Sequence, residues 1–339
     1  MATTTNVPSS TVQTPGRPKS RRNEGTGRLA ASLLSPTFIV LGLVVLYPII
    51  SAIRQSMFNS NNGLDENGFV VEGEKFVGLK NYTDIFTGDT AHRFWNAFYN
   101  TTFFTVVAVS IETLLGLAMA LVMHRAFRGR GLVRASVLVP WAIPTAISGL
   151  LWAWIFNSDN GIANVILHKQ VLWTTEGFHA KVAVIIADTW KTAPFIGLLV
   201  LAGLQIIPQE IYEAAKVDGA RAWRQFRLIT LPLVKPALLV AVLFRLLDTL
   251  RMFDLPYVLI GANKQSAETL TMLGYDQAQR LNYGPASAYA FILFLYVVVV
   301  AFMFVRILGA DVIGTARAQR QPRAPRRPRT PAQKEVQPA

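Results

Sequence analysis

Long apolar runs separated by short polar segments make up most of the chain. Several exceed the ~18–20 residues that an α-helix needs to cross a bilayer. They lie at residues 29–53, 97–123, 133–156, 182–207, 233–260 and 286–308. The pattern predicts an all-α integral membrane protein with six transmembrane helices, the third of them kinked by Pro140 and Pro144.

The two ends of the chain have a different composition. Residues 1–28 and 309–339 are rich in Pro, Thr and Arg, and together they supply +9 of the formal net charge of +13. Neither segment contains an aromatic residue, so the basic charge does not have the pattern of a nucleic-acid-binding face. We expect both segments to be disordered tails, because they have almost nothing to bury.

The charges between the apolar runs predict the topology. Basic residues gather in both tails, in residues 124–134 and in the segment that follows residue 207. Acidic residues gather in residues 58–92, namely Asp65, Glu66, Glu72, Glu74, Asp84 and Asp89, while residues 157–180 and 261–284 are close to neutral. Because basic loops stay in the cytoplasm, six spans place both termini there.

Composition also excludes several classes of function. Only 16% of residues are charged, well below the ~25% of an ordinary soluble domain. The chain has no cysteine, and its four histidines show no metal-ligand spacing. It lacks the GxxxxGK[ST] loop of an ATPase and shows no nucleophile–base constellation. We therefore expect no catalytic residue, no metal and no cofactor bound by this chain.

Charged residues inside the apolar runs need an explanation, since each costs at least ~2.5 kcal/mol on insertion scales. Asp188 and Lys191 are three residues apart and could pair with each other. The charged residues of the fifth run also recur at every third position. This spacing spreads them over half of the circumference of one helix. That half-face must contact protein or a water-filled cavity. The residues are Glu112, Asp188, Lys191, Arg245, Asp248, Arg251 and Asp254.

Two interpretations of these charges remain open. They line a hydrophilic path for a polar solute, or they are structural pairs that hold helices together. Asp188, Lys191 and Arg245 fit both interpretations, whereas the position of Asp248, Arg251 and Asp254 nearer the outer half of the run favours the path. For Glu112 the structural interpretation is favoured, with Gly116 and Ala120 marking close helix packing.

A polar stretch interrupts the apolar runs and reads EAAKVDGARAWRQFRLITLPLVKP over residues 213–236. A short helix is predicted from Gln209 to Asp218, followed by Gly219 as a left-handed C-terminal residue. A second amphipathic helix is predicted to carry Trp223, Phe226 and Ile229 on one side. We expect it to end at Leu231–Pro232, with Pro236 beginning the next run.

This stretch resembles the EAA loop of binding-protein-dependent ABC importer permeases. The matching residues are Glu213, Ala214, Ala215, Asp218, Gly219, Ala220, Ile229, Leu231 and Pro232. Residues 76–82 (FVGLKNY) and 251–259 (RMFDLPYVL) are similar to segments of the sugar permeases in that family, although residues 260–264 (IGANK) replace the usual Gly-rich turn. Residues 116–134 and 188–195 most resemble the trehalose branch.

The resemblance covers roughly residues 76–308 and implies a function. The chain would be a permease subunit, with its core at about 95–308, of an ATP-driven importer in the cell membrane. Its cargo would be a sugar, namely a disaccharide such as trehalose. Its partners would be a second permease, two ATPase subunits that bind ATP and Mg²⁺, and an extracytoplasmic sugar-binding protein. The charged residues of the fourth and fifth spans would line the sugar path. The residues that dock on the ATPase would be Glu213, Ala214, Ala215, Asp218 and Gly219.

Alternatives exist at two levels. Maltose-type oligosaccharide and glycerol-phosphate importers share the same scaffold. A secondary transporter would show a repeat between the two halves, and a membrane enzyme would show a His or carboxylate cluster; the sequence shows neither. The polar stretch itself could instead be an interfacial helix whose basic residues contact lipid headgroups, which are Lys216, Arg221, Arg224 and Arg227.

Overall fold

The computed structural model describes residues 24–60, 63–64, 70–71, 73–175 and 177–308. The predicted disorder of residues 1–23 and 309–339 lies outside the described residues, as do Asp65 and Glu66 of the acidic loop. Residues 24–28, predicted as part of the N-terminal tail, instead begin helix α1 (Glu24–Leu41).

The N-terminal unit, residues 1–51, contains one long apolar helix. It consists of α1, the π-helical turn η1 (Gly42–Leu46) and the start of α2 (Tyr47–Gln55). The N–H of Tyr47 donates to the carbonyl of Gly42, five residues back. Because a proline ring crowds the carbonyl four residues before it, this wide turn makes room for Pro48 without ending the helix.

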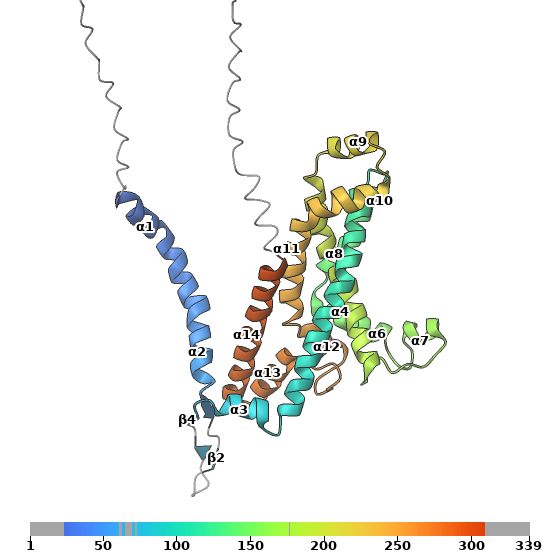
Figure 1. The fold of residues 1–339 in the computed structure, drawn as a ribbon. Coiled ribbons are helices and arrows are strands. Elements are labelled where there is room, and N and C mark those ends of the chain that lie inside the picture. Colours follow the sequence, from blue (N-terminus) through green and yellow to red (C-terminus); the bar gives the residue numbers. More distant parts are fainter. Residues whose placement is uncertain (1–23, 61–62, 65–69, 72, 176, 309–339) are drawn as a thin grey trace, which may run out of the picture. The chain divides into compact units, whose positions relative to one another are not determined.

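The second unit, residues 52–339, holds the remaining elements (Figure 1). Strand β1 (Phe58–Ser60) pairs antiparallel with β4 (Glu74–Phe76), and β2 (Gly63–Leu64) pairs with β3 (Val70–Val71). The helical elements are α3 (Lys80–Thr87), α4 (Ala91–His124), α5 (Arg130–Ala142), α6 (Thr145–Ile155), α7 (Ile162–Leu167), α8 (Phe178–Gln205), α9 (Gln209–Val217), α10 (Ala222–Gln225), the π-helix η2 (Phe226–Thr230), α11 (Leu231–Thr249), α12 (Asp254–Leu259), α13 (Leu270–Gln279) and α14 (Tyr283–Leu308).

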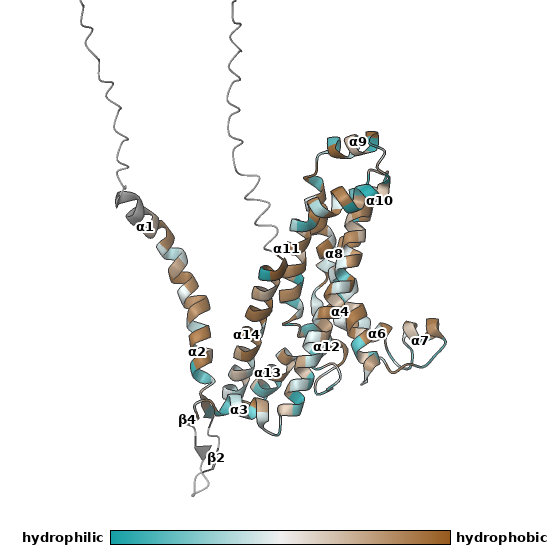
Figure 2. Ribbon diagram, in the orientation of Figure 1, coloured by the Kyte–Doolittle hydropathy of each residue, from teal (hydrophilic) through white to brown (hydrophobic). Residues whose placement is uncertain are grey.

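Helix α8 forms the centre of this unit and packs along α4 and α11. Of its most apolar 18-residue window, 72% is buried, against 33% for α4 and none for α14. Figure 2 shows that brown, hydrophobic residues cover these helices along most of their length. Across the described residues, five helices are long and apolar enough to span a membrane, and a bent pair of helices makes a sixth span if the two are counted together.

Small residues allow the central helices to approach closely. A Cβ on Gly116 of α4 would lie 2.7 Å from Cβ of Ile196 in α8, and one on Gly203 of α8 would lie 2.5 Å from Cβ of Ala237 in α11. Ala120 is fully buried in the same layer. The packing role predicted for Gly116 and Ala120 is confirmed.

The third span is broken rather than kinked. Helices α5 and α6 meet at an angle of 94°. Ile143 is extended at the junction, because the residue before a proline disfavours the helical region and Pro144 follows. Pro144 therefore turns one predicted helix into two half-helices, while Pro140 lies inside α5.

The fifth span is also broken, which corrects the continuous helix predicted over residues 233–260. Helix α11 ends at Thr249 and α12 begins at Asp254. Pro256 has no N–H to donate to the carbonyl of Met252, where a continuous helix would need it. That carbonyl instead accepts a 2.9 Å hydrogen bond from the hydroxyl of Thr269.

The polar stretch runs into the fifth span without the predicted stop at Leu231–Pro232. Residues 222–249 form one helix that passes through η2. The N–H of Leu231 donates to the carbonyl of Phe226, five residues back. The widened turn makes room for the ring of Pro232, as at Pro48, so the helix continues.

At the end of the unit away from α9, polar contacts fix the loops. The side-chain amide of Asn81 donates to the carbonyls of Ser56 (2.8 Å) and Phe58 (3.1 Å). Arg93, at the start of α4, bonds to Glu268 (2.8 Å) and Asp276 (3.0 Å). These contacts tie residues 56–58 to α3, and α4 to α13.

The close approach of α4 and α8 gives a prediction. Gly116→Val places a side chain against Ile196 and should lower the free energy of unfolding by about 1–3 kcal/mol. Gly131→Val is the control, because a Cβ on Gly131 meets nothing within 4 Å. The measurement is thermal unfolding of the purified chain in detergent. Equal melting points for the two variants would contradict the packing described.

Candidate functional site

One arginine lies at the centre of the buried charges. Arg245 of α11 has only 3% of its side chain exposed. Its Nε and Nη2 donate to the two carboxylate oxygens of Glu112 in α4 at 2.6 and 3.0 Å. Nη2 also donates to Asp188 of α8 at 2.8 Å, and Nη1 to Asp248 of α11 at 2.6 Å. Arg245 thereby joins the three central helices.

This cluster is well satisfied for a buried charge. The fork of Arg245 matches the carboxylate of Glu112 in a two-pronged contact, the stronger geometry for such pairs. The hydroxyl of Thr192 donates to the same carboxylate at 2.7 Å. Glu112 is fully buried and pairs with Arg245, which agrees with the structural interpretation predicted for it. Removing one partner of such a cluster leaves the other buried charges unpaired, which costs several kcal/mol of folding free energy.

Lys191 does not pair with Asp188, which corrects the predicted contact within α8. Its Nζ donates to the carbonyls of Ile143 at 2.6 Å and Trp141 at 3.4 Å. These carbonyls lie where α5 stops, so they lack the N–H partners of a continuing helix. Lys191 therefore supplies the missing hydrogen-bond donor, and Asp188 accepts a hydrogen bond from Arg245 instead.

All six residues predicted for the solute path line one cavity of about 130 Å³: Asp188, Lys191, Arg245, Asp248, Arg251 and Asp254. The four charged residues of the fifth span do not lie on one half-face of a continuous helix, as was predicted for them, because α11 ends at Thr249. The break carries Arg251 and Asp254 around to face the same space. Thr145, at the start of α6, completes a polar lining drawn from α6, α8, α11 and α12.

A second cavity of about 200 Å³ shares part of this lining and adds aromatic rings. Trp141 and Phe195 are stacked with ring centroids 5.7 Å apart, and Phe244 lies beside them. Sequence reasoning missed these three residues, since aromatics are common in membrane spans. Of the three, only Trp141 had a local feature in the sequence that pointed to the site, namely its position between Pro140 and the break. Polar and aromatic surface together suit a ligand with both hydroxyls and C–H faces.

Helix α9 ends as the sequence predicted. Gly219 has φ of +75°. Its N–H donates to the carbonyl of Lys216, and the N–H of Ala220 donates to that of Ala215. These two bonds are the Schellman arrangement, which needs a residue that accepts a left-handed conformation. Gly219 therefore turns the chain away from α9 within one residue, and the residues Glu213 and Ala214 stay exposed.

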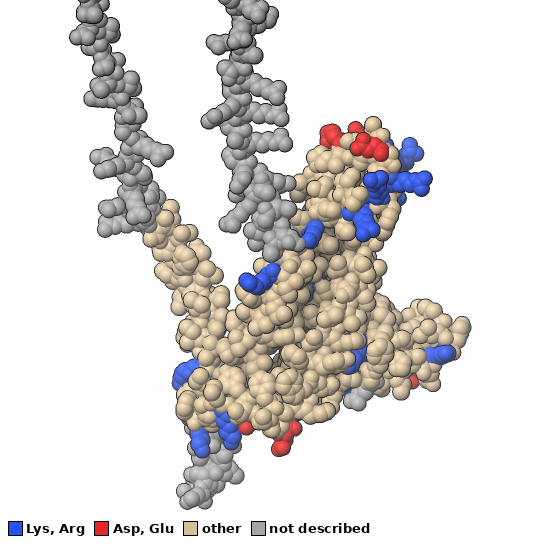
Figure 3. Space-filling model, viewed as in Figure 1, with Lys and Arg blue, Asp and Glu red and all other residues tan. Residues whose placement is uncertain are grey.

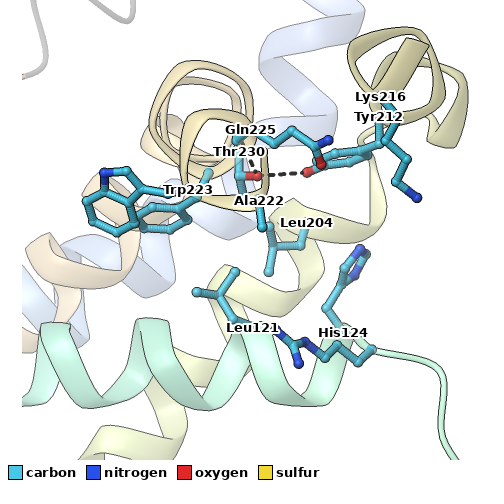
Figure 4. A pocket seen from close by; sticks show the side chains of 11 residues that line it. Leu121, His124, Leu204, Tyr212, Lys216, Ala222, Trp223, Gln225 and Thr230 are labelled. Carbon is cyan, nitrogen blue, oxygen red and sulfur yellow. Dashed lines mark hydrogen bonds between the residues drawn. The ribbon is translucent and has the colours of Figure 1, made fainter. Parts of the chain in front are cut away.

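A side-chain contact holds α9 against the following helix. The hydroxyls of Tyr212 and Thr230 lie 3.2 Å apart (Figure 4). After the Gly219 turn, the side-chain amide of Gln225 donates to the carbonyl of Ala220 at 2.7 Å. Sequence reasoning missed the contact between Tyr212 and Thr230, because it joins residues on opposite sides of the Gly219 turn. Through it, α9 is attached to the helix that continues into α11.

Charge is unevenly distributed over this end of the molecule. Figure 3 shows acidic side chains gathered on α9 and basic side chains on the adjoining segment. The acids of α9 include Glu210 in its first turn, where a carboxylate suits the helix dipole. Within the described residues, no group of three or more His, Cys, Asp or Glu side chains could hold a metal ion.

The sequence of residues 112–313 matches the family described as "Binding-protein-dependent transport system inner membrane component". The chain belongs to this family. It is therefore a multi-pass permease of the cell membrane, and its family is one of non-catalytic membrane components, as expected.

Curated relatives cover most of this permease. It is 37% identical over 285 residues to the trehalose/maltose transport system permease protein MalF of Thermococcus litoralis, covering 83% of this chain and 93% of the relative. It is 38% identical over 288 residues to the trehalose transport system permease protein SugA of Mycobacterium tuberculosis, covering 85% and 91%. It is 35% identical to the sulfoquinovosyl glycerol transport system permease protein SmoG of Agrobacterium fabrum, covering 84% and 91%.

Solved structures confirm the fold. A chain of a bacterial ABC transporter involved in the import of alginate superposes with a TM-score of 0.68 at 22% identity, covering 84% of the permease and 97% of that chain. A chain of a bacterial alginate ABC transporter in complex with an alginate-bound periplasmic protein superposes with a TM-score of 0.71 at 20% identity. The permease thus has the all-α fold of ABC importer membrane subunits.

The buried charge cluster yields the second prediction. Arg245→Met leaves Glu112 and Asp188 buried without a cation, and should lower the free energy of unfolding by about 3–5 kcal/mol. Adding Glu112→Gln and Asp188→Asn should recover part of that loss. Asp248→Asn is the control, since 62% of the Asp248 side chain is exposed. Thermal unfolding and yield of the permease in detergent are measured. An Arg245→Met variant as stable as Asp248→Asn would contradict the role given to this arginine.

Proposed function

We propose that the permease imports a disaccharide such as trehalose as one subunit of an ATP-driven, binding-protein-dependent importer. The observation that carries this proposal is the identity of 37–38% to trehalose and trehalose/maltose permeases over more than four-fifths of the chain. Sulfoquinovosyl glycerol, named for another relative, is also a glycoside. Maltose-type oligosaccharides and glycerol phosphate are the alternative cargoes on this scaffold.

The chemistry of the two adjoining cavities supports a sugar. Charged groups form strong hydrogen bonds with hydroxyls, and the path residues supply both donors, such as Arg251, and acceptors, such as Asp254. Trp141, Phe195 and Phe244 supply apolar walls. Each cavity, about 130 or 200 Å³, is smaller than the ~300 Å³ of a typical ligand pocket. We infer that a second, similar permease subunit completes the chamber.

Helix α9 is proposed as the contact with a separate ATPase subunit, of which the complete importer has two. The site would consist of Glu213, Ala214 and Ala215, with Asp218 and Gly219 at its end. Ala214 has a small side chain and is exposed beside the Glu213 carboxylate, so a groove on the partner can approach the helix backbone. ATP and Mg²⁺ would bind the ATPase subunit, on the cytoplasmic side to which the positive-inside rule assigns both termini of the permease.

The continuity of the helices suggests how motion reaches the cavity. Helix α9 is held to η2 through the contact between Tyr212 and Thr230, and residues 222–249 form a single helix. Arg245, Asp248 and the start of the break lie at the far end of that helix. A displacement of α9 during ATP hydrolysis would therefore shift the side chains that line the path, and open it to the extracytoplasmic binding protein.

Sugar uptake tests this proposal. Vesicles holding the complete importer should accumulate labelled trehalose only with ATP and binding protein, and in preference to maltose and glycerol phosphate. Asp254→Ala should reduce uptake at least tenfold, roughly the effect of losing a charged hydrogen bond to the ligand, while the complex still assembles. Asp89→Ala, an exposed acid outside the cavities, is the matched control.

Three outcomes would count against the proposal. Accumulation of maltose or glycerol phosphate in place of trehalose would replace the proposed cargo. Uptake driven by an ion gradient without ATP would indicate that the permease is a secondary transporter and not a subunit of an ATP-driven importer. Normal uptake by Asp254→Ala would remove this cavity from the path.

A further inference from the structure

A groove of about 750 Å³ lies beneath α9, at the end of the molecule away from the solute cavities (Figure 4). It is bounded by the last turn of α4, the last turn of α8, α9, and the start of the helix that continues into α11. The lining residues are Leu121, His124, Arg125, Leu204, Tyr212, Lys216, Ala222, Trp223, Gln225, Phe226 and Thr230. Neither the sugar path nor the proposed ATPase contact uses this space.

The two charged side chains that line the groove, Arg125 and Lys216, are both basic. Arg125, which directly follows α4, and Lys216 of α9 both line the groove, together with His124 at the end of α4. None of the acids of α9 lines it: Glu210, Glu213 and Asp218 are all absent from the lining. Two cations from separate elements thus face one space that contains no carboxylate. That arrangement favours an anionic group between them.

The rest of the groove is apolar. Leu121 and Leu204 form its floor, and the rings of Trp223 and Phe226 lie with centroids 5.5 Å apart at one side. Trp223 is 72% exposed although it is one of the largest apolar side chains. The groove lies where α4 and α8, both candidate membrane spans, end. Tryptophan and basic residues at such a position are typical of the boundary between hydrocarbon and headgroups.

We propose that this groove binds an anionic phospholipid. The lipid phosphate lies between Arg125 and Lys216, and an acyl chain lies along Leu121, Leu204 and Phe226. Charge and shape together favour this ligand: a free phosphate would leave the apolar floor uncovered, and a zwitterionic lipid would gain less from two cations with no carboxylate nearby. The bound lipid bridges α4 and α9, and so supports α9 from the membrane side.

Lipid retention tests the proposal without reference to transport. The full-length permease, purified with the subunits that accompany it, is stripped of lipid. It is then mixed with phosphatidylglycerol, phosphatidylcholine or inorganic phosphate and examined by native mass spectrometry. Phosphatidylglycerol should be retained in preference to the other two. The double substitution Arg125→Gln with Lys216→Gln should reduce its retention roughly tenfold or more, since each basic residue contributes about a fivefold preference.

The matched control is Arg224→Gln with Arg227→Gln. Both arginines are exposed on the same segment and neither lines the groove, so this variant should retain the lipid. Equal retention of phosphatidylcholine, equal loss in the control variant, or equal binding of inorganic phosphate would each overturn the proposal. Because the readout is lipid mass and not sugar uptake, its failure is distinguishable from failure of the proposed transport function.

Discussion

The burial of Arg245 among carboxylates from three helices constrains the structure more than any other interaction. A buried guanidinium must keep its partners, because each charge left alone in the apolar interior costs several kcal/mol. Glu112 on α4 and Asp188 on α8 are therefore held at fixed positions relative to α11. The close packing at Gly116, one turn from Glu112, becomes possible only in that register. The polar cavity forms beside the cluster, where Asp248 reaches solvent.

The two helix breaks depend on the same requirement, that every buried polar group has a partner. Each break frees backbone carbonyls, which cannot stay unpaired in an apolar environment. Lys191 satisfies the carbonyl of Ile143, and Thr269 satisfies that of Met252. Both breaks border the cavity, so irregular backbone occurs where polar partners are available. The π-helical turns before Pro48 and Pro232 solve the opposite problem, since they let a helix pass a proline without breaking.

Local patterns in the sequence predicted what depends on local physics. The apolar runs located the long helices, and the residues from Gln209 to Gly219 predicted α9 with its left-handed end. The six path residues were found because a charged side chain inside a membrane span costs free energy, and they do meet in one cavity. Their pairing could not be predicted, because Asp188 bonds to Arg245, 57 residues away, and not to its neighbour Lys191. The break after Thr249 was missed for a similar reason: the hydroxyl that stabilises it belongs to Thr269.

A cysteine-protection experiment shows whether α9 carries the proposed contact with an ATPase. The chain has no native cysteine, so Ala214→Cys provides a single thiol on the exposed face of α9. In inside-out vesicles, a membrane-impermeant maleimide should label this thiol quickly when the permease is alone. It should label it at least tenfold more slowly when the ATPase is bound, while Gly129→Cys in the neighbouring loop reacts at the same rate in both states. Equal labelling of Ala214→Cys with and without the ATPase would contradict the account.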